Sequence, residues 1–232
     1  MRALSIKDNL AIVRQQLSLA ATKSGRSPEE IKLIAVSKKK PAAMINEAIL
    51  ANQTAFGENM IQEAINKMSA INNFDNIEWH MIGHLQKNKV KFCPGNFDWI
   101  HSIDSIELAK KLEDRCAAKQ QNINVLIQVN ISQEKSKFGV QKLSELYQLA
   151  EILHAGHWIK LRGLMTIPEP DLGEASTRKI FEKVRIWKEQ LRVELGAPEI
   201  NELSMGMTAD FKWAIQEGAT MIRLGSAIFG PR

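Results

Sequence analysis

The stretch Ile123-Asn124-Val125-Leu126-Ile127-Gln128-Val129-Asn130 (INVLIQVN) contains the clearest buried strand of the sequence. It is a nearly continuous apolar run, and strands of parallel sheets have this composition because both of their faces are buried. A parallel strand reaches its neighbour through a crossover connection, which is usually a helix. We therefore expect helices before and after residues 123–130, and the same alternation of strand and helix elsewhere in the chain.

The alternation extends over the whole sequence of 232 residues. At its start, Ile6, Leu10, Val13 and Leu17 recur at helical spacing, which predicts an amphipathic helix over residues 5–24. Strands are predicted at 31–37, 54–56, 77–82, 99–103, 123–130, 161–165, 200–204 and 220–224. Helical segments between them are predicted at 27–30, 41–51, 59–70, 85–92, 105–120, 140–154, 173–195 and 209–217.

Eight strand signals separated by helical connections predict an α/β fold, a (β/α)8 TIM barrel with an additional N-terminal helix. A doubly wound open sheet has the same local pattern and is the alternative, but the count of eight favours a closed barrel. No break in composition marks a domain boundary, and 44% of the residues are hydrophobic, enough for one substantial core. We therefore expect residues 1–232 to form one domain.

Composition excludes several classes of protein. No run approaches the roughly 20 apolar residues that span a bilayer, and the charged N-terminus does not match a signal peptide. The two cysteines, Cys93 and Cys116, lack metal-ligand spacing, which predicts a reducing cytoplasmic setting and no metal site. The net charge of +5 suits nucleic acid, an anionic small ligand or solubility alone. No aromatic residues alternate with the basic runs, which disfavours nucleic acid.

Polar and small residues follow the predicted strands. The loops after the strands form the active-site face of a barrel, so these residues are expected at one rim. Their convergence predicts a small anionic ligand. The rim candidates are Lys38, Asn59, His84, Met165, Ser204, Met205, Gly206, Arg223, Gly225 and Ser226.

Lys38 directly follows the first apolar strand and precedes Lys39 and Lys40. A lysine that is desolvated near other cations has a lowered pKa, and its neutral amine can attack a carbonyl group. The alternative is that Lys38 opens a solvated basic loop, which is the reading we favour for the two lysines after it.

The loop that begins with Ser204, Met205 and Gly206 suits an anion, because glycine lets backbone N–H groups approach closely and serine adds a hydroxyl. The loops after the last two strands of a barrel often form a phosphate site. The alternative is a tight turn that requires glycine. Arg223 lies in an apolar strand, where an arginine needs a partner, either a carboxylate of Glu202 or Asp210 or a ligand.

The sequence also resembles a known family in a series of motifs that occur in order along the whole chain. They are Ala35-Val36-Ser37-Lys38, Phe56-Gly57-Glu58-Asn59, Trp79 to Lys89, Ser136-Lys137-Phe138-Gly139, Arg162-Gly163-Leu164-Met165, Leu203 to Asp210, and Arg223 to Gly230. With these motifs the chain resembles the pyridoxal phosphate homeostasis proteins of the YggS/PROSC type, whose barrel is similar to the N-terminal domain of alanine racemase.

The resemblance implies that Lys38 holds pyridoxal 5'-phosphate (PLP) as a Schiff base. It implies that Arg223 faces the pyridine nitrogen, that Ser204, Gly225 and Ser226 hold the phosphate, and that Asn59, His84 and Met165 surround the ring. It further implies a carrier or regulator of PLP that acts without catalytic turnover, with apo-enzymes that use PLP as its partners. The lack of a second domain predicts a monomer, and the cysteine usage predicts the cytoplasm.

Two other functions remain open on the sequence. A fold-type III PLP enzyme, such as an amino-acid racemase, needs an acid or base on each face of the ring, and no partner opposite Lys38 is evident. Tyr147, the one tyrosine of the chain, lies on a predicted helix. A barrel enzyme that binds a phosphorylated metabolite without PLP would use the same rim.

Overall fold

The computed structural model describes residues 4–71, 76–132, 134 and 138–231. Residues 1–3, to which the expectation about a signal peptide partly applies, lie outside these ranges, as do Ser136 and Lys137 of the quoted motifs.

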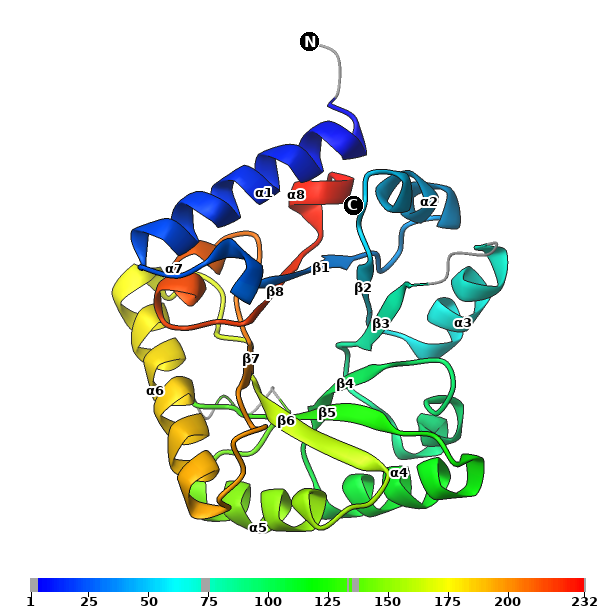
Figure 1. Ribbon diagram of the computed structural model, residues 1–232, viewed down its shortest axis with the longest axis vertical. Coiled ribbons are helices and arrows are strands. Elements are labelled where there is room, and N and C mark those ends of the chain that lie inside the picture. The colour runs from blue at the N-terminus through cyan, green and yellow to red at the C-terminus, as the bar shows by residue number, and fades with distance from the viewer. Residues whose placement is uncertain (1–3, 72–75, 133, 135–137, 232) are drawn as a thin grey trace.

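Eight parallel strands close into a barrel in chain order, so the prediction of a (β/α)8 barrel is confirmed (Figure 1). Closure is made by β1 and β8, which pair in parallel from Lys32 and Met221 to Ala35 and Leu224. The strands are β1 (Lys32–Val36), β2 (Ala55–Glu58), β3 (Glu78–Met81), β4 (Trp99–Ile103), β5 (Ile123–Gln128), β6 (Ile159–Met165), β7 (Glu202–Ser204) and β8 (Met221–Leu224).

Helices surround the barrel. They are α1 (Ile6–Lys23), α2 (Ala42–Leu50), α3 (Ile61–Ala70), α4 (Ile106–Lys119), α5 (Leu143–His154), α6 (Gly173–Glu194), α7 (Phe211–Gln216) and α8 (Ser226–Phe229), with 3-10 turns η1 (Pro28–Glu30) and η2 (Lys87–Phe92). The helix after β8 has a single turn, and α1 packs against α7, α8 and α2 at that position (Figure 1). The N-terminal helix therefore completes the outer ring.

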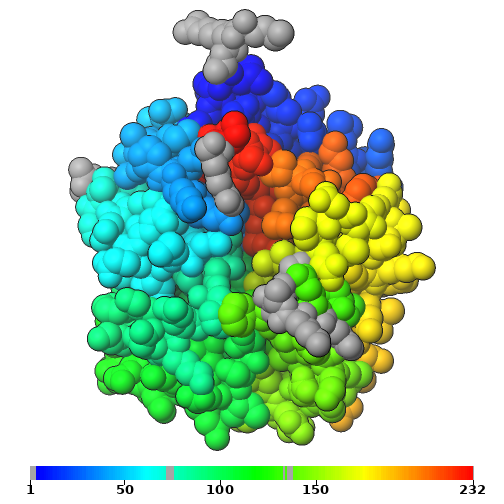
Figure 2. Space-filling view, turned by 180° about the vertical axis from the view of Figure 1, so that it is seen from behind, coloured from blue at the N-terminus to red at the C-terminus, as the bar shows by residue number. Residues whose placement is uncertain are grey.

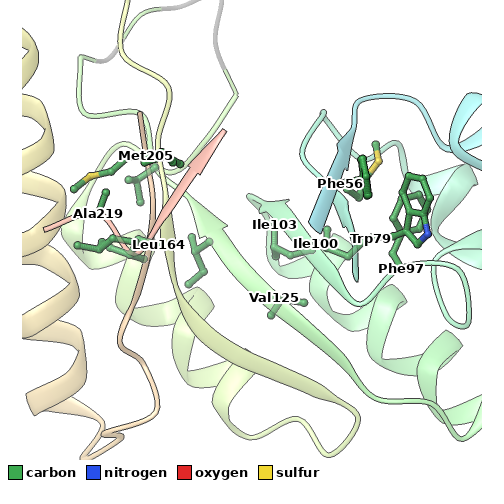
Figure 3. Close-up of a cluster of buried hydrophobic side chains, with 14 of the residues drawn as sticks. Phe56, Trp79, Phe97, Ile100, Ile103, Val125, Leu164, Met205 and Ala219 are labelled. Carbon is green, nitrogen blue, oxygen red and sulfur yellow. The ribbon is translucent and has the colours of Figure 1, made fainter. Parts of the chain in front are cut away.

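Apolar side chains fill two regions. The larger one lies between the strands and the helices. There the tilted rings of Phe56 and Trp79 have centroids 5.6 Å apart, and Leu164 and Met205 gather with Ala219 on the opposite side (Figure 3). The smaller one is a separate cluster of buried residues. Its members are Ile34, Ala55, Trp99, Leu126, Met165 and Met221.

Element boundaries differ from the predictions for local reasons. The second strand extends to Glu58 because Gly57 and Glu58 pair with β3. The fifth strand ends at Gln128, since Val129 bridges to Val140 instead. The segment predicted as helical at 85–92 is the 3-10 turn η2, and α8 was not predicted because four residues carry no periodicity.

Candidate functional site

Two of the cavities that open at the face where the strands end contain Lys38. Figure 2 shows this face hollowed between the blue and cyan residues that follow β1 and β2 and the orange and red residues that follow β7 and β8. The lining of the first, about 380 Å³, includes Lys38, Lys40, Asn59, Met207, Thr208, Ala209, Arg223, Gly225 and Ser226. The lining of the second, about 570 Å³, includes Lys38, Lys39, Asn59, Glu63, His84, Gln86 and Lys89. Lys38 and Asn59 line both, so the two cavities adjoin at these residues.

Lys38 is placed by the end of β1. The strand continues for one residue beyond Val36, because the backbone N–H of Ser37 donates to the carbonyl of Gly57 at 3.0 Å. The chain then turns at Lys39, whose φ of 60° lies in the left-handed region. Lys38 is half-buried between the strand and this turn. Lys38 is thus attached directly to the buried end of a strand and not to a long loop.

Lys40, expected in a solvated loop, is instead half-buried. Its Nζ donates to the carbonyls of Phe229, Gly230 and Pro231 at 3.1, 3.2 and 2.8 Å. It therefore fixes the segment after β8 against the loop after β1.

Arg223 projects from β8 and is 4% exposed. Its Nη1 donates to Ser204 Oγ at 2.6 Å and its Nη2 donates to the carbonyl of Thr166 at 2.9 Å. Burial lowers the pKa of Arg223 to about 10, and the nearby charge of Asp210 acts in the opposite direction. The guanidinium therefore keeps its proton at neutral pH.

A buried chain of hydrogen bonds continues from Arg223 through the barrel. His101 Nδ1 lies 2.8 Å from Ser204 Oγ, and His101 Nε2 lies 2.9 Å from His80 Nδ1. The chain of hydrogen bonds ends at His80, whose Nε2 lies 3.4 Å from Glu78 Oε1 at the start of β3 without forming a hydrogen bond. Burial, reinforced by neighbouring cations, holds the pKa of both imidazoles well below the usual value, so both histidines are neutral.

Two hydroxyl groups line the smaller cavity together with Arg223. Ser226 Oγ donates to Thr208 Oγ1 at 3.3 Å, and both residues are exposed. Gly225 lies between Ser226 and the strand, and a Cβ on it would lie 3.2 Å from the carbonyl oxygen of Val36. Small residues at the end of β8 thus let the backbone come close to β1 and leave two hydroxyls at the opening.

Asp210 follows Thr208 by two residues, and burial raises the pKa of its carboxyl. Its Oδ1 accepts a hydrogen bond from the Met207 N–H at 2.6 Å, which fixes the loop that carries Thr208.

Asn59 and His84 lie at the wall of the larger cavity. The residue before His84 must be glycine, because a Cβ on Gly83 would lie 2.3 Å from the carbonyl oxygen of Asn59. The His84 ring stacks on Phe138 with centroids 3.6 Å apart, and its Nδ1 lies 3.6 Å from Asp104 Oδ2. Burial raises the pKa of Asp104, while the charge of His84 opposes that shift.

The structure brings Lys38, Asn59, Arg223, Gly225 and Ser226 together at one cavity, with His84 at the next. The other four predicted residues lie below the surface: Met165, Ser204 and Met205 are 0% exposed, and Gly206 is buried. The hydroxyl of Ser204 is hydrogen-bonded to Arg223 and His101, and its expected contact with phosphate stays a prediction.

Gly206 fits the turn interpretation. Its φ is 96°, its carbonyl accepts from the Arg223 N–H at 2.9 Å, and a Cβ would lie 2.6 Å from the Cβ of Ala214. Glycine is therefore required there for the backbone.

Thr208 and Lys40 are site residues that the sequence reasoning did not select. Thr208 lies within the motif Leu203 to Asp210, so its position in the predicted phosphate loop was the available signal. The contacts of Lys40 join residues about 190 apart, and no local pattern reveals them.

In the described part of the chain, no three His, Cys, Asp or Glu side chains form a group that could hold a metal ion. Within the same residues, no helix is long and apolar enough to cross a membrane.

These observations define a class of protein. It is a closed parallel barrel whose mouth carries a lysine, a buried arginine and two hydroxyls. Residues 7–232 match the family model described as "Alanine racemase, N-terminal domain". The chain is 45% identical over 229 residues to the pyridoxal phosphate homeostasis protein of Escherichia coli K12, covering 98% of this chain and 97% of that protein. The protein of the same name from Vibrio alginolyticus is 43% identical over 231 residues, covering 98% of each chain.

A solved structure is also similar over its full length. PipY of Synechococcus elongatus PCC7942 with PLP bound superposes with a TM-score of 0.88 at 35% identity, covering 97% of this chain and 100% of that one. The chain therefore belongs to the alanine racemase N-terminal domain family and, within it, to the pyridoxal phosphate homeostasis proteins.

Proposed function

We propose that this protein binds PLP with Lys38 as the Schiff-base lysine and serves the homeostasis of that cofactor. The observation that carries the proposal is the 380 Å³ cavity, which places an amine, a guanidinium and two hydroxyls around one space. PLP supplies an aldehyde, which a neutral lysine amine takes up as a Schiff base. The family membership and the PLP bound to PipY support the same assignment.

Each polar group of the cavity has a counterpart in the cofactor. Thr208 and Ser226 offer hydroxyl donors suited to a phosphate, and the Lys40 ammonium adds positive charge beside them. Ser204 acts through Arg223, since its hydroxyl accepts from that side chain. Asn59 lies between the two cavities and bounds the space next to Lys38.

Arg223 determines which chemistry this site favours. Its pKa of about 10 lies far above that of a pyridine nitrogen, so the guanidinium donates a hydrogen bond and keeps its proton. A ring nitrogen that gains no proton is a weaker electron sink. We therefore propose a carrier or buffer of PLP that delivers it to apo-enzymes in the cytoplasm, working as a monomer.

The proposal is tested by absorbance and by borohydride reduction. We expect added PLP to give the spectrum of a Schiff base, and reduction followed by mass spectrometry to place the cofactor on Lys38. The Lys38→Ala variant should lose the signal, whereas Lys39→Ala, at the exposed neighbouring lysine, should keep it. A label on another lysine of the wild-type protein, or no spectral change, would overturn the assignment.

One observation favours a second candidate, a PLP enzyme of the racemase type. His84 with Asp104 is an imidazole–carboxylate pair at the rim of a cavity that also contains Lys38. A two-base racemase needs an acid or base on each face of the ring, and Lys38 and His84 would be these two groups. Loss of α-deuterium from amino acids that disappears in both Lys38→Ala and His84→Ala would establish it. A PLP-loaded wild-type protein that exchanges no α-deuterium would exclude it.

A further inference from the structure

Lys67 on α3 is a buried lysine, with 8% of its surface exposed. Lysines are rarely buried without partners. Its Nζ donates to Glu58 Oε1 at 2.7 Å, to Glu63 Oε1 at 2.6 Å, and to the carbonyl of Ser37 at 2.7 Å. The ammonium thus joins two carboxylates and one backbone carbonyl.

The backbone carbonyl belongs to the residue immediately before Lys38. Ser37 is held a second time, because its Oγ donates to Glu58 Oε1 at 2.6 Å. Glu58 is the last residue of β2 and is 0% exposed. The cluster therefore fixes the end of β1 to the end of β2 and to α3.

The residue immediately after Lys38 is held by the same cluster. The backbone N–H of Lys39 donates to Glu63 Oε1, the oxygen that also accepts from Lys67. A residue other than glycine in the left-handed region costs about 1 kcal/mol or more and persists where its surroundings hold it. The φ of 60° at Lys39 is such a conformation, and the carboxylate of Glu63 holds it.

We propose that Glu58, Glu63 and Lys67 form a clamp that fixes the backbone on both sides of Lys38 and so positions its amine for the cofactor. The clamp rests on the proposed function, because it assigns positioning residues to the Schiff-base lysine. Isolated buried ion pairs contribute little net stability. This one binds the two peptide groups that flank a single side chain of the site, which gives its buried charges a positioning role.

Lys188 provides a matched control. It lies on α6, is also 8% exposed, and its Nζ pairs with Glu189 at 2.8 Å and contacts the carbonyl of Asn201 at 3.4 Å. Replacing Lys67 or Lys188 by Met removes one buried, paired ammonium in each case. Only the former loses a bond to the backbone next to Lys38.

The first measurement is the rate at which PLP forms a Schiff base, followed by absorbance in stopped flow. We expect Lys67→Met to slow it by about tenfold, because a small displacement of a reacting group has an effect of this order or more. Lys188→Met should stay within about twofold of the wild-type rate. Glu63→Ala should slow the reaction, and Glu63→Gln should restore much of the rate, since its amide oxygen can still accept from the Lys39 N–H.

The second measurement uses the cofactor-free protein. Amide hydrogen exchange at Lys39 should be about tenfold faster in Glu63→Ala than in the wild type, and unchanged in Lys188→Met. Glu63 has a side chain that is 25% exposed, so this variant tests the clamp even if Lys67→Met fails to fold.

The outcomes separate the two proposals. Loading at the wild-type rate in Lys67→Met and Glu63→Ala, or equal slowing in Lys188→Met, would overturn the clamp alone. A wild-type protein that takes up no PLP on Lys38 would overturn the proposed function. In that case, faster amide exchange at Lys39 in Glu63→Ala than in the wild type would show a clamp that holds the backbone without serving this cofactor.

Discussion

At the scale of the residue, Arg223 shows how a cation is kept inside the barrel. It is almost fully buried, and yet its two terminal nitrogens each donate to an oxygen, one of a hydroxyl and one of a backbone carbonyl. Buried polar groups persist when they are hydrogen-bonded in this way. Its neighbours are therefore as important to the site as the arginine itself.

The neutral histidines make stability depend on pH. His80 and His101 stay neutral in the folded state because burial depresses their pKa, whereas in the unfolded chain they gain a proton as the pH falls through about 6.5. The unfolded state then binds more protons, so the free energy of unfolding decreases below pH 6.5 by about 1.4 kcal/mol per pH unit for each histidine. The loss continues until the pH reaches the depressed folded-state values.

Urea unfolding of the wild type and of His80→Phe between pH 7.5 and 5.5 measures this effect. We expect the variant to lose less stability on acidification, by about 1.4 kcal/mol over that range. Other titrating groups are common to both proteins and cancel in the difference. Equal losses in the two proteins would contradict the assignment of a neutral His80.

At the scale of the element, α1 performs the task of an eighth outer helix. Leu10 of α1 is 0% exposed, whereas Leu19 of the same helix is 56% exposed. We expect Leu10→Ala to lower the free energy of unfolding by about 2–5 kcal/mol and Leu19→Ala to change it by less than about 0.5 kcal/mol. Denaturant unfolding measures both, and equal effects would mean that α1 does not close the ring.

The elements could be predicted from sequence where periodicity is strong. The apolar stripe of residues 5–24 predicted α1, and the apolar run beginning at Ile123 predicted β5. Prediction fell short where distant residues decide the outcome. The contact of Ser204 with phosphate stays a prediction, but no local pattern indicated that its hydroxyl binds His101, which is 103 residues away in the sequence. Lys67 looks like an ordinary helix residue until β1 and β2 place Ser37 and Glu58 beside it.

At the scale of the whole molecule, the two ends of the described chain are joined. Asn9 Nδ2 donates to the carbonyl of Ile228 at 2.9 Å, and β1 pairs with β8. Loss of any strand would open the sheet, so the stability of each strand depends on elements far away in the sequence.

That residues 1–232 form one domain stays a prediction. We expect far-UV and near-UV circular dichroism to report one coincident thermal transition, and two separate transitions would contradict it.

The polar chain beneath Arg223 has a direction. Arginine can only donate, so Ser204 Oγ accepts from Arg223 and its own proton is available to His101 Nδ1. With that bond in place, the neutral His101 carries its proton on Nε2 and donates to His80. By the same reasoning His80 is the Nε2 tautomer, with its N–H toward Glu78. A carboxylate at position 223 would accept from Ser204 and move every proton to the other nitrogen, leaving His80 with a bare nitrogen toward an anion. The cation at the mouth and the carboxylate at the opposite end of the barrel therefore favour the same pair of histidine tautomers.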